Sequence, residues 1–307
     1  AVAEGIVSVL NASIVIPSVS DARRLETTLI SLLENRPSDC EIVVPHSGYY
    51  DDPYDIADEV RLIDVPAART EVELLAVGWS MCQAPIVHTL APGATVEAGW
   101  MDDALARFQQ PEVMAVAPQS QFSDGDATYG VVADDFGMRA AGTTAHVQAP
   151  MRQAGFYRYS LLAALGGFST RMEEYADLDI GLWLAEAGGQ CEVASGSVVQ
   201  LNVPNDLASV SADRIRLAKT LQLRHQEWFA ARGKASSGKL GWLSRSVGSG
   251  SISTMMSALT AKADAKAALH RLPDLDDVRA VIEGRDQTFR FDPRNDRPTR
   301  PIHRSAA

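Results

Sequence analysis

The sequence predicts an α/β protein built on an open, doubly wound, mostly parallel sheet with helices on both faces. Short apolar runs alternate with stretches of helical spacing along residues 12–117, which is typical of parallel strands joined by crossover helices. The apolar runs are unbroken, as expected for buried strands. Hydrophobic residues make up 46% of the 307 residues, which is ordinary for a globular protein and argues against a disordered chain.

The first crossover unit is expected at residues 12–45. It comprises an apolar run at 12–17, a helix at 21–35 with leucine at positions 25, 29, 32 and 33, and a second apolar run at 41–45. The leucine spacing gives the helix one apolar face. Because a strand, a helix and a strand at this spacing form a right-handed crossover, the two strands are expected to be parallel neighbours.

The alternation continues beyond this unit. Further strands are expected at 60–65, 85–90, 113–117, 191–194 and 198–201, and further helices around 101–108, at 177–187, at 209–232, near 252–259 and at 275–282. Residues 70–73 form a capping-box pattern, which predicts a helix that turns Leu74, Val77 and Met81 inward. Residues 119–150 lose this periodicity, so they are expected to form a loop or an irregular hairpin.

Composition and charge narrow the function classes. The net charge of −11 argues against nucleic acid as the main partner. No stretch reaches the roughly 20 apolar residues of a membrane span, and the start lacks a signal-peptide pattern, so a cytoplasmic protein is expected. The three cysteines form neither a disulfide framework nor a zinc pattern. The Arg- and Pro-rich segment 285–304 could contact an acidic membrane surface peripherally, or be a loosely docked tail.

Two residue types that often bind ligands have a simpler interpretation here. His88 lies within an apolar strand, where a core histidine is commoner than a ligand. Trp79, Trp100 and Trp183 fall at helical or helix-edge positions, which favours core packing over stacking on a sugar. None of the four is therefore assigned to a binding site.

Several segments occur in the order and spacing of a known family. They are the strand 13–17 ending in Ile-Pro, the leucine-spaced helix after it, Gly-Gly-Phe at 166–168, Tyr-Ala-Asp-Leu-Asp-Ile at 175–180 and Ala-Gly at 187–188. Here the chain resembles the family 2 glycosyltransferases, nucleotide-diphospho-sugar transferases of the GT-A fold. The resemblance covers roughly residues 13–203. It implies a GT-A domain at 1–233, with a nucleotide-binding half at about 1–95 and an acceptor half at 96–205, followed at 234–307 by a linker, a helical extension and a tail.

The chain departs from the family at the metal-binding motif. Active members carry an Asp-x-Asp motif after the fourth strand, which binds a divalent cation on the sugar-nucleotide diphosphate, and such a hard cation needs oxygen ligands. Ala91, Pro92 and Gly93 occupy these positions here. Pro45 and His46 replace the Asp-Asp pair of the second-strand turn, and no histidine lies at 200–202, where the family often has one. The resemblance implies Mg²⁺ or Mn²⁺ as a cofactor, whereas the residues present predict no metal ligand.

The resemblance also implies a set of site residues. Asp177, or its neighbour Asp179, would be the general base that accepts the acceptor's proton, although both could instead cap the helix that begins there. The positions implied for nucleotide-sugar binding are Pro17, Ser18, Ser20, His46, Ser47, Asp51, Asp52, Arg69, Leu90, Ala91 and Arg158. The serines and the Asp-Asp-Pro sequence are also ordinary turn formers. The arginines that could replace the metal's charge, or could be ordinary surface residues, are Arg69, Arg152, Arg158 and Arg171.

Two functions from different classes remain open on the sequence alone. The first is an enzyme that transfers a hexose from a nucleotide sugar to a carbohydrate or lipid-linked acceptor, with inversion at the anomeric carbon. The second is a catalytically inactive relative that uses the same cleft to bind a sugar, a nucleotide or a partner protein. Because one fold hosts many functions, both predict the same sheet.

Overall fold

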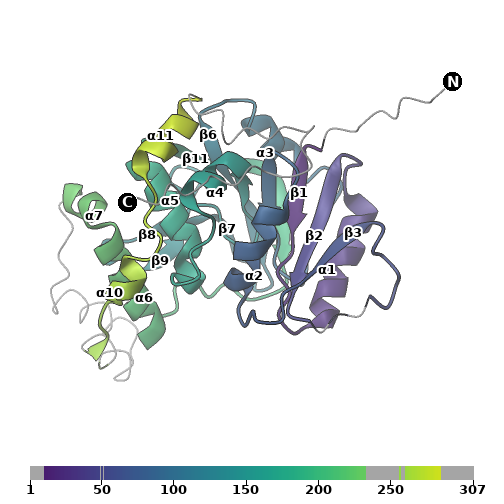
Figure 1. The fold of residues 1–307 in the computed structure, drawn as a ribbon, viewed down its shortest axis with the longest axis horizontal. Helices are drawn as coiled ribbons and strands as arrows, with labels where there is room; N and C mark the ends of the chain where they lie inside the picture. The colour runs from purple at the N-terminus through teal and green to yellow at the C-terminus, as the bar shows by residue number, and fades with distance from the viewer. Residues whose placement is uncertain (1–9, 49, 51, 233–255, 257–259, 285–307) are drawn as a thin grey trace, which may run out of the picture.

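The computed structural model describes residues 10–48, 50, 52–232, 256 and 260–284 (Figure 1). Its central sheet has the strand order β3-β2-β1-β4-β10-β6-β11-β5, and β7 pairs with β6 beside this path. The strands are β1 (Ala12–Val15), β2 (Cys40–His46), β3 (Val60–Asp64), β4 (Ile86–Thr89), β5 (Ala94–Val96), β6 (Val113–Phe122), β7 (Ala127–Tyr129), β10 (Phe156–Arg158) and β11 (Gln190–Leu201). β1 to β4 run parallel, as do β6 and β11, whereas β10 runs antiparallel to both its neighbours. The expected α/β sheet is confirmed, with antiparallel strands in its second half.

Helices cover both faces of the sheet. They are α1 (Ala22–Asn35), α2 (Glu71–Gly78), α3 (Asp102–Arg107), α4 (Tyr159–Leu165), α5 (Ala176–Glu186), α6 (Ala212–Arg224) and α7 (Gln226–Ala231), with 3₁₀ turns η1 (Trp79–Met81) and η2 (Glu173–Tyr175). The chain moves outward from β1 to β3 and then returns to place β4 on the other side of β1. Right-handed crossovers then put α1 and α2 on opposite faces. The strand order therefore reverses between β1 and β4, and the carboxyl ends of strands at such a reversal are where open α/β sheets bind ligands.

Local sequence explains how the first half of the sheet folds. Asp21 caps α1 by accepting a hydrogen bond from the Arg24 backbone N–H at 3.0 Å. The capping box predicted at 70–73 is present at the start of α2. Leu74 is buried as expected, but Met81 is 39% exposed, because it lies in η1, where the α-helical spacing no longer applies.

Three segments are more regular, or differently divided, than the sequence pattern predicts. Residues 119–150 contain the end of β6, β7 and a hairpin of β8 (Val131–Ala133) and β9 (Arg139–Ala141), whose short strands carry too few apolar residues to show a period. β11 is one strand with an irregularity between Ala194 and Val198, not two strands. The helix expected at 209–232 is broken at His225, whose backbone is not helical (φ −116°, ψ 41°).

The C-terminal helices α10 (Ala265–Ala268) and α11 (Leu275–Ile282) pack on the rest of the protein. α10 contacts α6, and α11 contacts α4 and α5. The helix expected near 252–259 lies almost wholly, and the segment 285–304 entirely, outside the described residues, so the domain division at residue 233 stays a prediction. Within the part of the chain that is described, no helix is both long enough and apolar enough to cross a bilayer.

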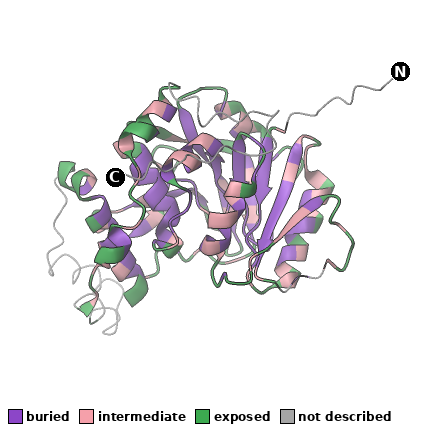
Figure 2. Ribbon diagram, in the orientation of Figure 1, coloured by how far each residue is buried: buried purple, intermediate pink, exposed green. Residues whose placement is uncertain are grey.

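The buried core follows the strands and the inner sides of the helices (Figure 2). His88 is fully buried in β4, as expected of a core histidine. Its ring stacks on Phe156 with centroids 3.7 Å apart, and its Nδ1 lies 3.1 Å from the Gly155 carbonyl oxygen. Its Nε2 accepts a hydrogen bond from Trp100 Nε1 at 3.2 Å, so the ring proton is on Nδ1. Burial lowers the pKa of His88 to about 3, and the ring stays neutral at physiological pH.

A His88→Phe variant is expected to lose less stability on acidification than the wild type. The pKa of His88 falls from 6.5 on folding, so the unfolded chain takes up a proton as the pH drops below that value and the folded protein does not. This contributes a slope of up to about 1.4 kcal/mol per pH unit. Urea unfolding between pH 6.5 and 4.5 measures the slope, with exposed His146→Gln as the control. Equal slopes in wild type and His88→Phe would contradict the assignment.

Candidate functional site

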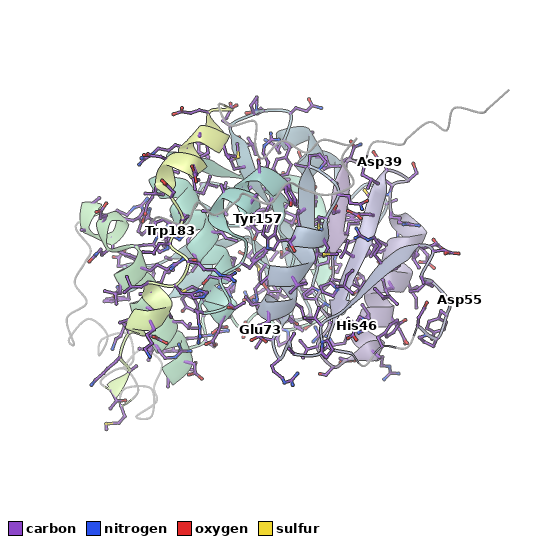
Figure 3. The ribbon with its side chains drawn as sticks, in the orientation of Figure 1. Asp39, His46, Asp55, Glu73, Tyr157 and Trp183 are labelled. Atoms are coloured by element: carbon purple, nitrogen blue, oxygen red, sulfur yellow. The ribbon has the colours of Figure 1, made fainter. Side chains whose placement is uncertain are left out.

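The carboxyl ends of β1 and β2 lie side by side at one edge of the sheet. Pro17 and Ser18 follow β1, while His46 ends β2 and leads into Ser47. Ser18 pairs with His46 in an isolated parallel bridge, and the Ser47 N–H donates to the Ser18 carbonyl at 3.3 Å. Figure 3 locates this edge, because Asp39 precedes β2 at its upper end and His46 marks the lower end. The structure thus brings together four of the residues predicted to bind a nucleotide sugar.

β4 and the loop before β10 complete this carboxyl edge. Because β10 is antiparallel to β4, the loop at 151–155 reaches the end of β4 where the ligand crevice is expected. The Leu90 N–H donates to the Val15 carbonyl, and the Ala91 N–H donates to the Gln153 carbonyl, both at 2.9 Å. The predicted residues Leu90 and Ala91 therefore lie between β1 and the 151–155 loop.

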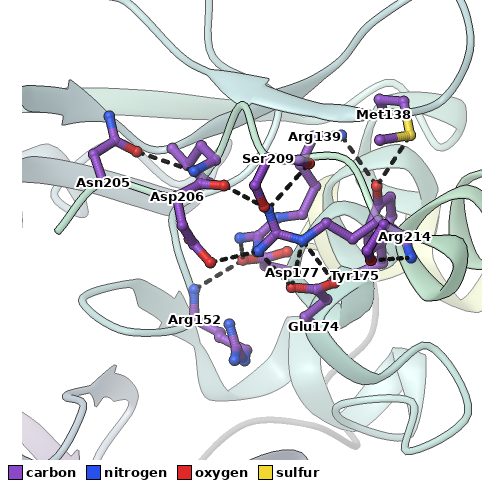
Figure 4. A network of polar contacts seen from close by, with 12 residues as sticks. Met138, Arg139, Arg152, Glu174, Tyr175, Asp177, Asn205, Asp206, Ser209 and Arg214 are labelled. Atoms are coloured by element: carbon purple, nitrogen blue, oxygen red, sulfur yellow. Dashed lines mark hydrogen bonds and ion pairs between the residues drawn. The ribbon is translucent and has the colours of Figure 1, made fainter. Parts of the chain in front are cut away.

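Asp177 lies in the first turn of α5, directly beside the 151–155 loop, and is fully buried. Its Oδ2 accepts a hydrogen bond from the Arg152 backbone N–H at 3.0 Å and lies 2.6 Å from Nη2 of Arg139. Its Oδ1 accepts a hydrogen bond from the Leu178 N–H at 2.8 Å, so the carboxylate also stabilises the helix start. Figure 4 shows Asp177 between Arg139 and Arg152, with Tyr175 and Glu174 on the same turn.

The carboxylate of Asp177 is held by a buried ion pair. A buried carboxylate needs a charged partner, and the buried guanidinium of Arg139 on β9 supplies one. Each carboxylate oxygen has two lone pairs, so Oδ1 could accept one more hydrogen bond, although the side chain is fully buried. Arg139 was not predicted, because it lies 38 residues from Asp177 on a strand that the sequence pattern does not reveal.

Asp179 does not belong to this site, which corrects its assignment as an alternative base. Two steps along an α-helix rotate a side chain by about 200°, so Asp179 points away from Asp177. Its Oδ1 lies 2.5 Å from Nε of Arg224 and 2.9 Å from Nε2 of His225, and the residue is buried. The carboxylate of Asp179 thus takes part in a separate ion-pair network on the far side of α5.

The two arginines assigned to nucleotide-sugar binding lie at opposite edges of the sheet. Arg158 ends β10 opposite Ile86, at the start of β4, because β10 is antiparallel. Its guanidinium donates to three backbone carbonyls of residues 108–113 at 2.7–2.8 Å, so its assignment to the site is wrong. Arg69 lies between β3 and α2 at the carboxyl edge, where it is exposed and donates to carbonyls of its own loop at 2.7 and 3.0 Å.

The remaining predicted residues lie on loops. Ser20 is exposed just before α1. Asp52 has a positive φ of 47°, and its carboxylate accepts hydrogen bonds from the N–H groups of Ile56 and Ala57 at 3.0 and 3.2 Å. Asp52 therefore has the turn-forming role that the sequence left open. Asp51 falls outside the described residues.

The described residues at the carboxyl edge do not fit a divalent cation. Among the residues that the structure describes, no three His, Cys, Asp or Glu side chains gather as a metal site would require. At positions 91–93 only backbone carbonyl oxygens could serve as metal ligands. The Gly93 carbonyl already accepts a hydrogen bond from Asn202 Nδ2 at 2.6 Å. By contrast, Nε and Nη1 of Arg152 are buried without a hydrogen-bond partner in the described structure. Its Nη2 lies 3.8 Å from Oε2 of Glu71, so this guanidinium has one acidic partner and two donors that make no hydrogen bond to the described residues.

Comparison with known proteins establishes the fold. No protein-family model and no curated protein matches the sequence. The crystal structure of GalNAc-T7 with UDP, GalNAc and Mn²⁺ is similar with a TM-score of 0.54 at 13% identity, over 71% of this chain and 51% of that one. The structure of S. aureus TarS is similar with a TM-score of 0.52 at 12% identity, over 90% of this chain and 55% of that one. The chain spans about half the length of these proteins, and it has the mixed α/β fold of the GT-A-type glycosyltransferases.

Proposed function

We propose that the protein is a glycosyltransferase-like enzyme that transfers a hexose from a nucleotide sugar to a carbohydrate or lipid-linked acceptor, with inversion at the anomeric carbon. One observation carries the proposal. Asp177 and the loop that follows β4 are joined through the 151–155 loop, at the strand ends where open α/β sheets bind ligands. The similarity of the fold to GalNAc-T7, whose crystal structure contains UDP and GalNAc, supports it.

The site divides into a donor side and a base side. On the donor side, Ser18 and His46 would face the nucleoside from the ends of β1 and β2, and Ala91 would face the sugar diphosphate. On the base side, Asp177 would face the acceptor hydroxyl. The backbone N–H of Arg152 bonds to Asp177, and its guanidinium, two of whose buried donors have no hydrogen-bond partner among the described residues, would stabilise negative charge on the departing diphosphate.

The proposed reaction is a single displacement. The acceptor hydroxyl gives its proton to Oδ1 of Asp177 while its oxygen forms a bond to the anomeric carbon. The bond between that carbon and the diphosphate oxygen breaks, and the nucleoside diphosphate leaves with the electron pair. Attack from the face opposite the leaving group inverts the configuration.

One feature favours a second function. Asp177 is fully buried, and both its oxygens already accept hydrogen bonds. A relative that binds a nucleotide sugar, or a partner protein, without turnover would need the same cleft but no accessible base. The two functions therefore differ in turnover rather than in fold.

Titration calorimetry followed by a release assay tests the proposal. The protein is titrated with UDP-glucose, UDP-N-acetylglucosamine, GDP-mannose and ADP-glucose, each with Mg²⁺, with Mn²⁺ and with EDTA. Every donor that binds is then incubated with the protein, and free nucleoside diphosphate is measured by chromatography. We expect saturable binding of one donor class and slow diphosphate release, since water replaces the acceptor. Binding without release, even with an acceptor panel, would favour the second function, and no binding would contradict both.

A further inference from the structure

A guanidinium occupies the space into which a side chain at position 93 would project. Gly93 has a φ of +89°, and a Cβ added to it would lie 2.8 Å from Nε and 3.3 Å from Nη2 of Arg24. By the resemblance described above, position 93 is where the second acid of the Asp-x-Asp motif would stand. The structure therefore has a fixed cation beside the backbone position from which a metal-binding carboxylate would extend.

The backbone holds Arg24 against this loop. The Gly93 N–H donates to the Arg24 carbonyl at 2.9 Å and lies 2.8 Å from Oγ1 of Thr28, one turn further along α1. On its other side, the Gly93 carbonyl accepts the Asn202 amide at the end of β11. Hydrogen bonds therefore join the Gly93 loop to α1 on one side and to the end of β11 on the other. They hold Gly93 close to the Arg24 guanidinium.

Arg24 carries its positive charge beside the Gly93 loop. Its side chain is half-buried in the first turn of α1, and no ion pair joins it to another described residue. The helix end itself is already capped by the carboxylate of Asp21, which accepts a hydrogen bond from the Arg24 backbone N–H, so the guanidinium is the group left to bind an anion. A guanidinium adds a planar pair of donors that matches two phosphate oxygens. The guanidinium therefore favours an anionic ligand at this end of the carboxyl edge.

Hydrogen bonds connect the Gly93 loop, which Arg24 contacts, to Asp177. Two residues before Gly93, the Ala91 N–H donates to the Gln153 carbonyl. The residue before Gln153 is Arg152, and its backbone N–H donates to Asp177. Arg24 and Asp177 therefore flank one continuous edge, the cation on the donor side and the carboxylate on the acceptor side.

We propose that Arg24 binds the diphosphate of the nucleotide donor and stabilises its charge without a divalent cation. This inference rests on the proposed function, and it assigns to that site a metal-independent mode of diphosphate binding. Arg24 was not among the arginines that the sequence pattern singled out, because it lies on an amphipathic helix where a charged residue is ordinary. Only the contact with Gly93, 69 positions away in the chain, distinguishes it from its exposed neighbour Arg23.

The test compares Arg24→Gln with Arg23→Gln. Titration calorimetry in EDTA with ADP, CDP, GDP and UDP identifies the nucleoside diphosphate that binds, and the matching monophosphate is titrated alongside. Arg24→Gln is expected to weaken diphosphate binding on the order of 10- to 100-fold and monophosphate binding less. Arg23→Gln is expected to leave both unchanged, and Arg24→Lys to keep part of the affinity. Thermal unfolding of each variant verifies that the fold is retained.

A second pair of variants perturbs the guanidinium without removing it. Gly93→Ala places a methyl group against Arg24, whereas Gly125→Ala adds the same methyl group at nearly the same φ (+90°) into open space. Both variants strain the backbone equally, because both glycines have a positive φ. Only Gly93→Ala is therefore expected to weaken diphosphate binding, through its contact with Arg24.

Three results would overturn the inference, and they are distinguishable. If Arg24→Gln and Arg23→Gln bind the diphosphate equally well, Arg24 does not bind it. If EDTA abolishes wild-type binding and Mn²⁺ restores it, a metal ion and not Arg24 stabilises the diphosphate charge. In either of these cases the protein still binds a nucleotide, so the proposed function is not contradicted. Failure of the wild type to bind any of the four diphosphates would reject the inference and the proposed function together.

Discussion

Replacement of Asp177 by asparagine is expected to slow glycosyl transfer by about 10²- to 10⁴-fold, the usual contribution of a general base. Asparagine keeps the shape of the side chain but cannot accept the acceptor's proton. It also leaves the Arg139 guanidinium buried without its charged partner. We therefore expect a loss of stability as well, of about 3–5 kcal/mol for breaking a buried pair. Rates must be normalised to the folded fraction.

Asp179→Asn is the matched control for this experiment. Asp179 lies on the same turn of the same helix and is also buried against arginine, but on the side away from the site. Its replacement is expected to cost similar stability and to leave the rate per folded molecule unchanged. A double variant, Asp177→Asn with Arg139→Gln, should recover stability by removing the unpaired charge, but not activity. If Asp177→Asn transfers sugar as fast as Asp179→Asn, Asp177 is not the base.

The sequence is most informative where one segment determines its own structure. The β1–α1–β2 unit and the α2 capping box follow from local spacing and capping. The placement of Ser18, His46 and Ala91 at one edge follows too, because parallel strands align their carboxyl ends. These inferences need no knowledge of distant contacts.

The predictions from the sequence are wrong where a residue's role depends on a partner far away in the chain. The pattern does not reveal the direction of the three-residue strand β10, and this direction moves Arg158 to the opposite edge. Asp177 and Asp179 look equivalent in the sequence, and only their distant partners distinguish them, Arg139 for Asp177 and Arg224 for Asp179. The contact between Arg24 and Gly93 is equally invisible, since neither residue type carries a signal of its own.

The ion-pair network on the far side of α5 is expected to anchor the C-terminal helices. Asp179 accepts from both Arg224 and His225, and the other ring nitrogen of His225 lies 2.9 Å from Oε1 of Glu186. The remaining donors of Arg224 reach the backbone carbonyls of residues 268, 270 and 271, which connect α10 to α11. One guanidinium therefore ties α5 to the C-terminal segment. We expect Asp179→Asn to expose amides of α10 and α11 to hydrogen exchange, whereas Asp213→Asn, at an 83% exposed side chain, should not.

The pH dependence of this anchor follows from the two shifted groups. Burial lowers the pKa of His225, but hydrogen bonds to Asp179 and Glu186 outweigh it and leave the pKa above 6.5. Its stabilising effect is therefore complete below pH 6.5 and is lost as the pH rises through the raised value. Burial raises the pKa of Asp179, but His225 and Arg224 bring it below 3.8, so its contribution is complete above that pH and is lost on acidification through the lowered value.

The anchor should accordingly be strongest between pH 3.8 and 6.5, the interval in which both contributions are complete. The difference in unfolding free energy between wild type and His225→Gln is expected to be largest there and to shrink at alkaline pH, as the imidazolium loses its proton. This trend is opposite to that of His88, whose buried neutral ring destabilises the fold as the pH falls below 6.5. The two histidines differ because one has two carboxylates beside its ring and the other a carbonyl and an indole. Urea unfolding of both variants from pH 4.5 to 9 would separate them, and a His225→Gln difference that grows above pH 6.5 would contradict a charged His225.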